Sequence, residues 1–242
     1  MPLSEQTPPS AEYRRLDERR IAQTLGRLRA RISERFPGSG LSRVADELGT
    51  LGEETTTLVA YLRQPHWPIR IGAGLAMTAM LGVLLVVVSY LPLSPRVLGY
   101  AEFVQAMDAA LSTLVFLGAT LFFLITLEVR IKRRRALAAL HQLRSVAHIV
   151  DMHQLTKDPE RITSPEPDTA SSPVRALSPS ELGRYLDYCS ELLSVISKLA
   201  ALHVQHFQDS VALAAVNEIE TLTTGLSGKI WQKITLLDQA AS

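Results

Sequence analysis

Two groups of histidine and aspartate residues have types and spacing that could bind a metal. They are His148, Asp151 and His153 in one group and His203, His206 and Asp209 in the other. Imidazole and carboxylate groups bind transition metals, and helical residues three or four positions apart can share a face. Such groups are more often ordinary surface or interface residues. We therefore predict no metal and no cofactor, and keep both groups as the candidates should a metal bind.

No motif for covalent or nucleotide chemistry is complete in this sequence. The stretch Gly225–Ile230 (GLSGKI) partly matches a phosphate-binding loop, but its first glycine is too close to Lys229, and Ile230 replaces the hydroxyl residue that binds magnesium. GxSxG, HExxH and CxxC motifs do not occur. Cys189 is the one cysteine, so no intramolecular disulfide forms, and its place on an apolar stripe favours a buried, inert thiol. We predict that the protein is not an enzyme.

The distribution of apolar residues indicates a membrane protein. The chain has 242 residues, 47% of them hydrophobic, and its 25 basic and 24 acidic residues nearly balance. Residues 71–91 and 109–127 contain no charge. A 21-residue helix reaches about 30 Å, the thickness of the hydrocarbon core of a bilayer. The sequence therefore predicts an all-α membrane protein built on a two-span transmembrane helical hairpin, residues 67–130.

Basic residues set the expected orientation of this hairpin. Arg63 and Arg70 precede the first span, and a basic run, residues 130–135, follows the second. The connecting loop 92–108 contains a single basic residue, Arg96. The positive-inside rule then places both termini in the cytoplasm. Because 20 of the 25 basic residues are arginine, we expect a bacterial protein of the inner membrane. The net charge of +1 and the lack of a known base-recognition motif argue against nucleic-acid binding.

Small residues recur on the first span. Gly74, Thr78 and Gly82 follow one another every four residues, a spacing that lets two helix backbones approach closely in a membrane. We interpret them as a packing face, used either against the second span or against a neighbouring subunit. The second alternative predicts a homo-oligomer.

The segment before the hairpin, residues 12–66, has the pattern of basic amphipathic helices. Its apolar residues recur at helical spacing from Leu16 to Phe36, with arginines between them. One interpretation is a helix on the anionic inner leaflet, and the other is an ordinary bundle helix with a solvated basic face. The candidate membrane-contacting residues, taken from both sides of the hairpin, are Arg14, Arg15, Arg19, Arg20, Arg133, Arg134 and Arg135.

The remaining regions are predicted from helix patterns and breakers. Residues 1–11 read as a disordered tail, 131–155 as a helical extension of the second span, 156–179 as a flexible linker and 180–242 as a C-terminal helical domain. Ser178-Pro179-Ser180-Glu181 has the pattern of a helix start with a capping box. Gly225 and Gly228 predict a break in the last helix.

The C-terminal domain carries an apolar stripe with alternating steps of three and four residues, typical of a coiled coil or helical bundle. Such a stripe needs a partner, either neighbouring helices or other copies of the chain. The residues of this predicted interaction stripe are Leu186, Cys189, Leu193, Ile196 and Phe207.

These patterns lead to three functional hypotheses. The first is a non-enzymatic inner-membrane protein that oligomerises and acts as a scaffold or adaptor, presenting its helical domain to a cytoplasmic protein partner. The second is a subunit of an oligomeric pore or channel with cytoplasmic gating helices. The third is a membrane-bound enzyme, which the absent motifs disfavour.

The packing face predicts a specific crosslink. A cysteine at Thr78, with Cys189 replaced by serine, should crosslink two chains in native membranes. Gly74→Leu combined with Gly82→Leu should reduce that crosslink, because bulky side chains force the helix backbones apart. Gel electrophoresis under non-reducing conditions measures the dimer fraction. Equal crosslinking in both proteins would show that this face does not join subunits.

Overall fold

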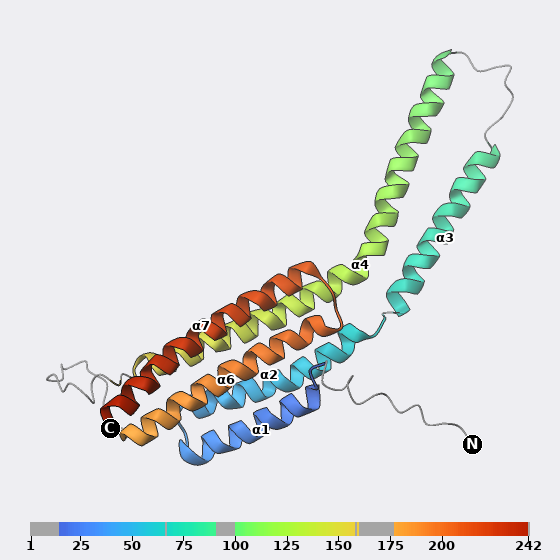
Figure 1. The fold of residues 1–242 in the computed structure, drawn as a ribbon. Helices are drawn as coiled ribbons and strands as arrows, with labels where there is room; N and C mark the ends of the chain where they lie inside the picture. The colour runs from blue at the N-terminus through green and yellow to red at the C-terminus, as the bar shows by residue number, and fades with distance from the viewer. Residues whose placement is uncertain (1–14, 66, 91–99, 158, 160–176, 242) are drawn as a thin grey trace, which may run out of the picture. The chain divides into compact units, whose positions relative to one another are not determined.

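The computed structural model describes residues 15–65, 67–90, 100–157, 159 and 177–241, and every regular element within them is an α-helix (Figure 1). The helices are α1 (Glu18–Arg35), α2 (Gly40–Arg63), α3 (Trp67–Tyr90), α4 (Tyr100–Leu155), α6 (Pro179–Gln205) and α7 (Ser210–Ala241). The predicted all-α class is confirmed. The predicted tail 1–11, Arg14 and most of the predicted linker 156–179 lie outside the described residues.

The chain divides into two compact units. One comprises residues 1–63 and 135–242, and contains α1, α2, α6, α7 and the C-terminal part of α4. We call it the bundle. The other comprises residues 64–134 and contains α3 and the N-terminal part of α4. We call it the hairpin. The helix α4 therefore contributes to both units.

Two helix starts follow directly from local sequence. Asp17 caps α1, and its Oδ1 accepts from the backbone N–H groups of Arg19 (2.8 Å) and Arg20 (3.2 Å). Ser178 caps α6, with Glu181 returning a bond to the Ser178 backbone N–H at 2.8 Å. This is the predicted capping box. The bonds from Ser178 lower the pKa of Glu181.

The bundle has its core around α6. Side chains on most of its circumference are buried, because α1, α2 and α7 all pack against it. The fully buried large residues of α6 are Leu186, Leu192, Leu193, Ile196, Leu199 and Leu202. Residues of α1, α2, the C-terminal part of α4 and α7 join the same cluster. The helices that precede and follow the hairpin therefore share one hydrophobic core.

Close approaches fix how α2 meets its neighbours. A Cβ added at Gly52 would lie 2.9 Å from Leu25 Cδ2 of α1, so glycine allows these two helices to approach. A Cβ added at Gly40, the first residue of α2, would lie within 3 Å of the His153 ring of α4. His153 therefore packs over the start of α2. The turn between α1 and α2 contains Gly38, which has a φ of 68°.

The helix α7 corrects one prediction. It runs unbroken from Ser210 to Ala241, although Gly225 and Gly228 predicted a break. Each glycine costs a helix interior about 1 kcal/mol. Burial of Leu226 and Ile230 in the bundle core outweighs that cost, since a fully buried aliphatic side chain contributes about 1.5–3 kcal/mol. The helix α4 ends at Leu155, which is the last residue of the predicted helical extension 131–155.

Bonds between α4 and α7 complete the bundle. Arg144 Nη1 donates to Glu218 Oε2 at 3.0 Å. Lys233 Nζ of α7 donates to the backbone oxygen of Gln154 (2.9 Å), in the last turn of α4, and to that of Lys157 (3.1 Å), two residues beyond the helix. The Gln154 oxygen also accepts from the Lys157 N–H at 3.1 Å, so the lysine adds a second bond at this helix end.

Because α6 lies at the centre of the core, shortening one of its buried side chains should cause a large loss of stability. Leu193→Ala should lower the free energy of unfolding by about 2–5 kcal/mol, because it opens a cavity among fully buried side chains. Urea unfolding of the full chain in detergent, followed by circular dichroism, measures the change. The adjacent exposed residue supplies the control, since Ser194→Ala should change the free energy by at most about 0.5 kcal/mol. Equal stability of Leu193→Ala and wild type would contradict this packing.

Candidate functional site

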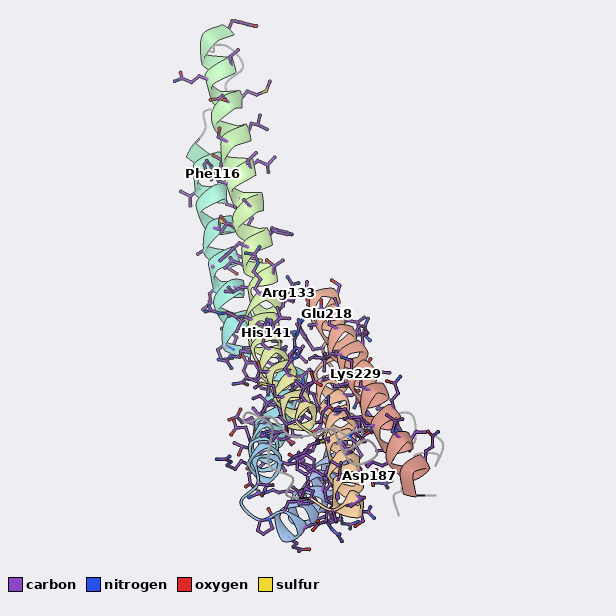
Figure 2. All side chains as sticks on the ribbon, turned by 90° about the vertical axis from the view of Figure 1, so that its left-hand side faces the viewer. Phe116, Arg133, His141, Asp187, Glu218 and Lys229 are labelled. Carbon is purple, nitrogen blue, oxygen red and sulfur yellow. The ribbon has the colours of Figure 1, made fainter. Side chains whose placement is uncertain are left out.

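The hairpin exposes large apolar side chains along both of its helices. Phe116 of α4 (Figure 2) is 74% exposed. The other exposed large apolar residues in the predicted spans are Ile71, Leu75, Leu81, Leu85, Val86, Leu111, Leu114, Val115, Phe122 and Phe123. Among the described residues, one helical stretch, Leu111–Leu155, is long and apolar enough to cross a membrane, and none of its most apolar window is buried. The crossing of α3 stays a prediction.

A charged cluster links α3 and α4 within the hairpin. Glu128 accepts from Arg70 Nε at 2.8 Å and from Lys132 Nζ at 2.9 Å. Lys132 also donates to the backbone oxygen of Gln64 at 2.9 Å. The side chains of Glu128 and Lys132 are only 13% and 9% exposed. In the sequence, Arg70 and Lys132 indicated only the topology, and Glu128 was not predicted as their partner, although the i, i+4 spacing of Glu128 and Lys132 is a recognised helix pairing.

No described residue covers the small-residue face of α3. A Cβ placed at Gly74 or Gly82 would meet no atom within 4 Å, and Thr78 is exposed. The Thr78 hydroxyl donates to the backbone oxygen of Gly74 at 2.9 Å, as threonines in helices commonly do. Packing of this face against the second span is therefore not observed, and packing between subunits stays a prediction.

The helix α1 corrects the interpretation of the basic segment. Its apolar residues Ile21, Leu25, Leu28 and Ile32 are buried in the bundle core, so this face is not free to insert into a leaflet. Some arginines on its outer face pair with neighbouring helices. They are Arg29, which binds Asp46 of α2 at 2.6 Å, and Arg31, which binds Glu191 of α6. The structure matches the alternative of a bundle helix with a solvated basic face.

The candidate membrane-contacting arginines differ in their surroundings. Arg15, Arg19, Arg20 and Arg134 are exposed, and Arg20 also lies 3.4 Å from Asp17 Oδ2. Arg133 is half-buried. The guanidinium of Arg135 lies over the ring of Tyr61, 4.4 Å from its centroid, which is a cation–π geometry within the bundle. Contact of these arginines with lipid stays a prediction.

The predicted interaction stripe lies inside the bundle. Leu186, Cys189, Leu193 and Ile196 have no exposed surface, and Phe207 is almost fully buried. Neighbouring helices of the same chain cover the stripe, so these residues do not form a surface for other copies or a separate protein. Burial raises the pKa of the Cys189 thiol to about 12, which keeps it protonated and unreactive at neutral pH.

The two histidine groups do not come together as metal sites. Among the described residues, no three His, Cys, Asp or Glu side chains are placed to hold a metal ion. In the first group, Asp151 accepts from Gln154 Nε2 at 2.6 Å and His148 is exposed. In the second, Asp209 caps α7 by accepting from the backbone N–H groups of Val211 and Ala212.

His203 has a structural position instead. It is 1% exposed, its Nδ1 lies 3.0 Å from the backbone oxygen of Leu199, and its Nε2 has no partner among the described residues. Burial lowers the pKa of the His203 imidazole, so the ring is held neutral in the folded protein. Such a group is a core residue rather than a ligand.

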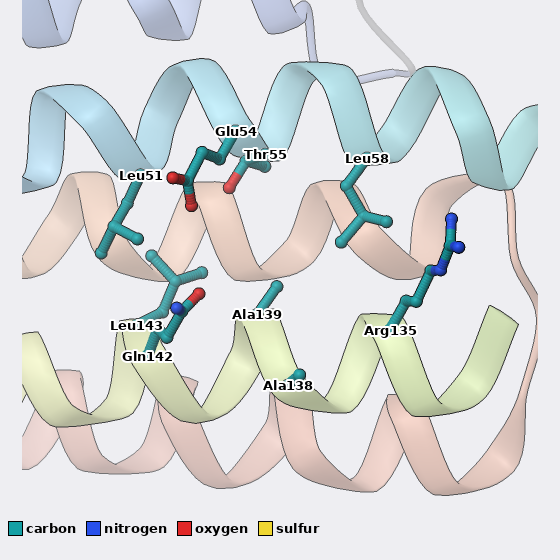
Figure 3. A pocket seen from close by; sticks show the side chains of 9 residues that line it. All are labelled: Leu51, Glu54, Thr55, Leu58, Arg135, Ala138, Ala139, Gln142 and Leu143. Atoms are coloured by element: carbon teal, nitrogen blue, oxygen red, sulfur yellow. The ribbon is translucent and has the colours of Figure 1, made fainter. Parts of the chain in front are cut away.

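A groove that was not predicted from the sequence lies between α2 and α4 on the bundle (Figure 3). Its volume is about 270 Å³. It is lined by Leu51, Glu54, Thr55, Leu58, Arg135, Ala138, Ala139, Gln142 and Leu143. An adjoining hollow shares Glu54, Leu58 and Arg135 and adds Thr50, Glu53, Thr57 and Tyr61. The signal in the sequence is the Ala138–Ala139 pair, whose short side chains leave space opposite Leu58.

Comparison with protein families, with curated proteins and with solved structures finds no match to this chain.

The burial of His203 predicts a pH dependence with a definite sign. Because its pKa is lowered from 6.5 in the folded protein, the unfolded chain binds the proton first as pH falls. Its contribution to the free energy of unfolding should therefore decline below about pH 6.5. Urea unfolding at pH 7.5 and 5.5 should show a smaller loss in His203→Leu than in wild type. The pKa of His153 is also lowered, but His153 is present in both proteins and cancels in the comparison. Identical losses would contradict the assignment.

Proposed function

We propose that the protein is a non-enzymatic integral membrane protein that holds a helical bundle at the cytoplasmic face as an adaptor or scaffold. In this proposal α3 and α4 cross the membrane as a two-span hairpin, with both termini in the cytoplasm. The membrane is a bacterial inner membrane, and the partner is a cytoplasmic protein.

The exposed apolar surface of α4 is the observation that carries the membrane part. Phe116, Phe122 and their neighbours are largely exposed, and no other described part of the chain covers them. Soluble monomers rarely expose contiguous apolar patches larger than about 300–600 Å². A bilayer removes this surface from water, and each Å² of apolar area so removed contributes roughly 25 cal/mol.

The interior of the bundle supports an adaptor over an enzyme. Cys189 and His203 are buried there, and burial disfavours the charged form of each. A nucleophile or a general base needs access to substrate and a pKa near the working pH. Among the described residues, the outer surface of the bundle carries charged side chains and the groove between α2 and α4, which are features of a binding surface.

Self-association of the hairpin is part of the proposal. Among the described residues, the face formed by Gly74, Thr78 and Gly82 has no neighbour. Lipid gives little hydrophobic drive for helix association, so close backbone packing at small residues is the main source of affinity between spans. An oligomer would present several bundles together and raise the effective concentration of their binding sites.

Topology reporters test the proposal. A phosphatase that folds only in the periplasm should be inactive when fused after Ser4 or after Ser242. The same phosphatase inserted after Gly99, in the predicted external loop, should be active and serves as the matched control. Cells that express each fusion at equal level are assayed for phosphatase activity. Activity from either terminal fusion would overturn the hairpin, and with it the display of the bundle in the cytoplasm.

A further inference from the structure

The groove between α2 and α4 combines an apolar floor with an acidic rim. Leu51 of α2 and Leu143 of α4 point toward each other in it, and the short Ala139 side chain lies opposite Leu58 (Figure 3). Glu54 is exposed on the α2 side, and Glu53 lines the adjoining hollow. Such a surface suits a ligand that is apolar on one face and positively charged beside it.

The acidic residues of the rim are free to bind a partner. Elsewhere on the bundle, arginines neutralise carboxylates, as Arg29 does for Asp46 and Arg144 does for Glu218. Within the described part of the chain, no ion pair or hydrogen bond engages the Glu53 or Glu54 carboxylate. An incoming basic group therefore gains their attraction without displacing an existing partner.

The length of the groove matches a short helix. From Thr50 to Tyr61 the rim on α2 advances eleven residues, about 17 Å at 1.5 Å per residue. A helix in an apolar groove is usually held by side chains at positions i, i+3 or i+4, and i+7. These three anchors span about 11 Å, so they fit between the ends of the rim with a turn to spare.

Arg135 gives the groove a direction. Its guanidinium is held over Tyr61 at one end, whereas Glu54 lies seven residues earlier on α2, about 10 Å away along the helix. The C-terminus of a helix carries about half a negative charge. A docked helix is therefore favoured with its C-terminus at Arg135 and a lysine or arginine, one to two turns earlier, at Glu54.

We infer that this groove binds a basic amphipathic helix of the cytoplasmic protein partner, lying parallel to α2. The inference rests on the proposed function and names the site through which the adaptor acts. Anionic lipid headgroups fit poorly, since Glu53 and Glu54 repel them. The basic helix α1 of a second copy also fits poorly, because its apolar residues are already buried in its own bundle.

A peptide-binding experiment tests the inference. The full chain is placed in nanodiscs of zwitterionic lipid, and binding to empty discs is subtracted. The probe is a fluorescein-labelled 15-residue helical peptide with leucine on one face and lysine on the other. A twin peptide carries glutamate in place of each lysine. Fluorescence anisotropy should show binding of the lysine peptide and at least tenfold weaker binding of the glutamate peptide.

Three variants locate the binding. Glu54→Lys reverses the charge of the rim and should weaken the lysine peptide about tenfold. Ala138→Phe fills the groove from an exposed position and should weaken it by a similar factor. Glu34→Lys makes the same charge change on the exposed face of α1 and should leave binding unchanged. Circular dichroism of each variant checks that the fold is intact.

Several outcomes would overturn the inference. Equal binding by wild type and Glu54→Lys would do so, as would a preference for the glutamate peptide. A wild-type dimer in native mass spectrometry that Ala138→Phe dissociates would assign the groove to a second copy. A photoreactive group at the peptide C-terminus should label residues near Tyr61, and labelling near Thr50 would overturn the direction.

This experiment is independent of the topology test. Purified protein in nanodiscs exposes both faces, so peptide binding does not depend on which side of the membrane the bundle occupies in cells. Reporter activity at the termini would overturn the proposed function even if the peptide binds. If the peptide does not bind and both terminal fusions are inactive, the groove assignment is overturned and the proposed function stands.

Discussion

The change in surface chemistry along α4 is the constraint on which the rest of the structure depends. Before residue 130, apolar side chains such as Phe116 and Phe122 are exposed. After residue 135, the buried apolar residues lie toward one side of the helix, at Ala136, Leu140, Leu143, Val146, Ala147 and Val150. The first pattern suits the apolar surroundings that the proposed membrane span would have, and the second suits a helix with water on one side and a packed core on the other. The basic residues 130–135 lie where the pattern changes.

Contacts within the protein determine which basic side chains of this run remain available for other partners. Lys132 is held by Glu128 and the Gln64 carbonyl, and Arg135 lies over Tyr61. Two residues that look equivalent in sequence to the exposed Arg134 are therefore already engaged by the protein. Ion pairs on the surface contribute only about 0–1 kcal/mol each. Their effect is to orient helices and to select which charges remain available, more than to stabilise the fold.

Features determined by neighbouring residues were predictable from the sequence. The capping box at Ser178 and the end of α4 both depend on local hydrogen bonds and on apolar spacing. Features that depend on tertiary contacts were not. Gly225 and Gly228 weaken a helix locally, and only the core around Ile230 shows why α7 continues. Likewise, a stripe of apolar residues predicts that one face of a helix is buried, but it does not identify the helix that buries it.

The candidate site shows the same division between local and tertiary information. The arginines near the spans and the small residues of α3 are visible in sequence, because each works through its own type and spacing. The groove needs Leu58 of α2 and Ala139 of α4, which are 81 positions apart, to face each other. Its acidic rim is also visible only in three dimensions, since Asp46 and Glu54 have similar side chains on one helix, yet an arginine of α1 engages Asp46.

Separation of charge over one bundle gives it more than one kind of surface. The net charge of the chain is +1, so long-range attraction to any single class of polyanion or polycation is weak. Locally, however, α1 presents arginines, and the rim of the groove presents Glu53 and Glu54. Complementary local charge raises association rates and rejects partners of like charge, while apolar contacts supply most of the affinity. The arginines of α1 and the acidic rim of the groove are different residues on different helices, so a ligand bound at one surface leaves the other available.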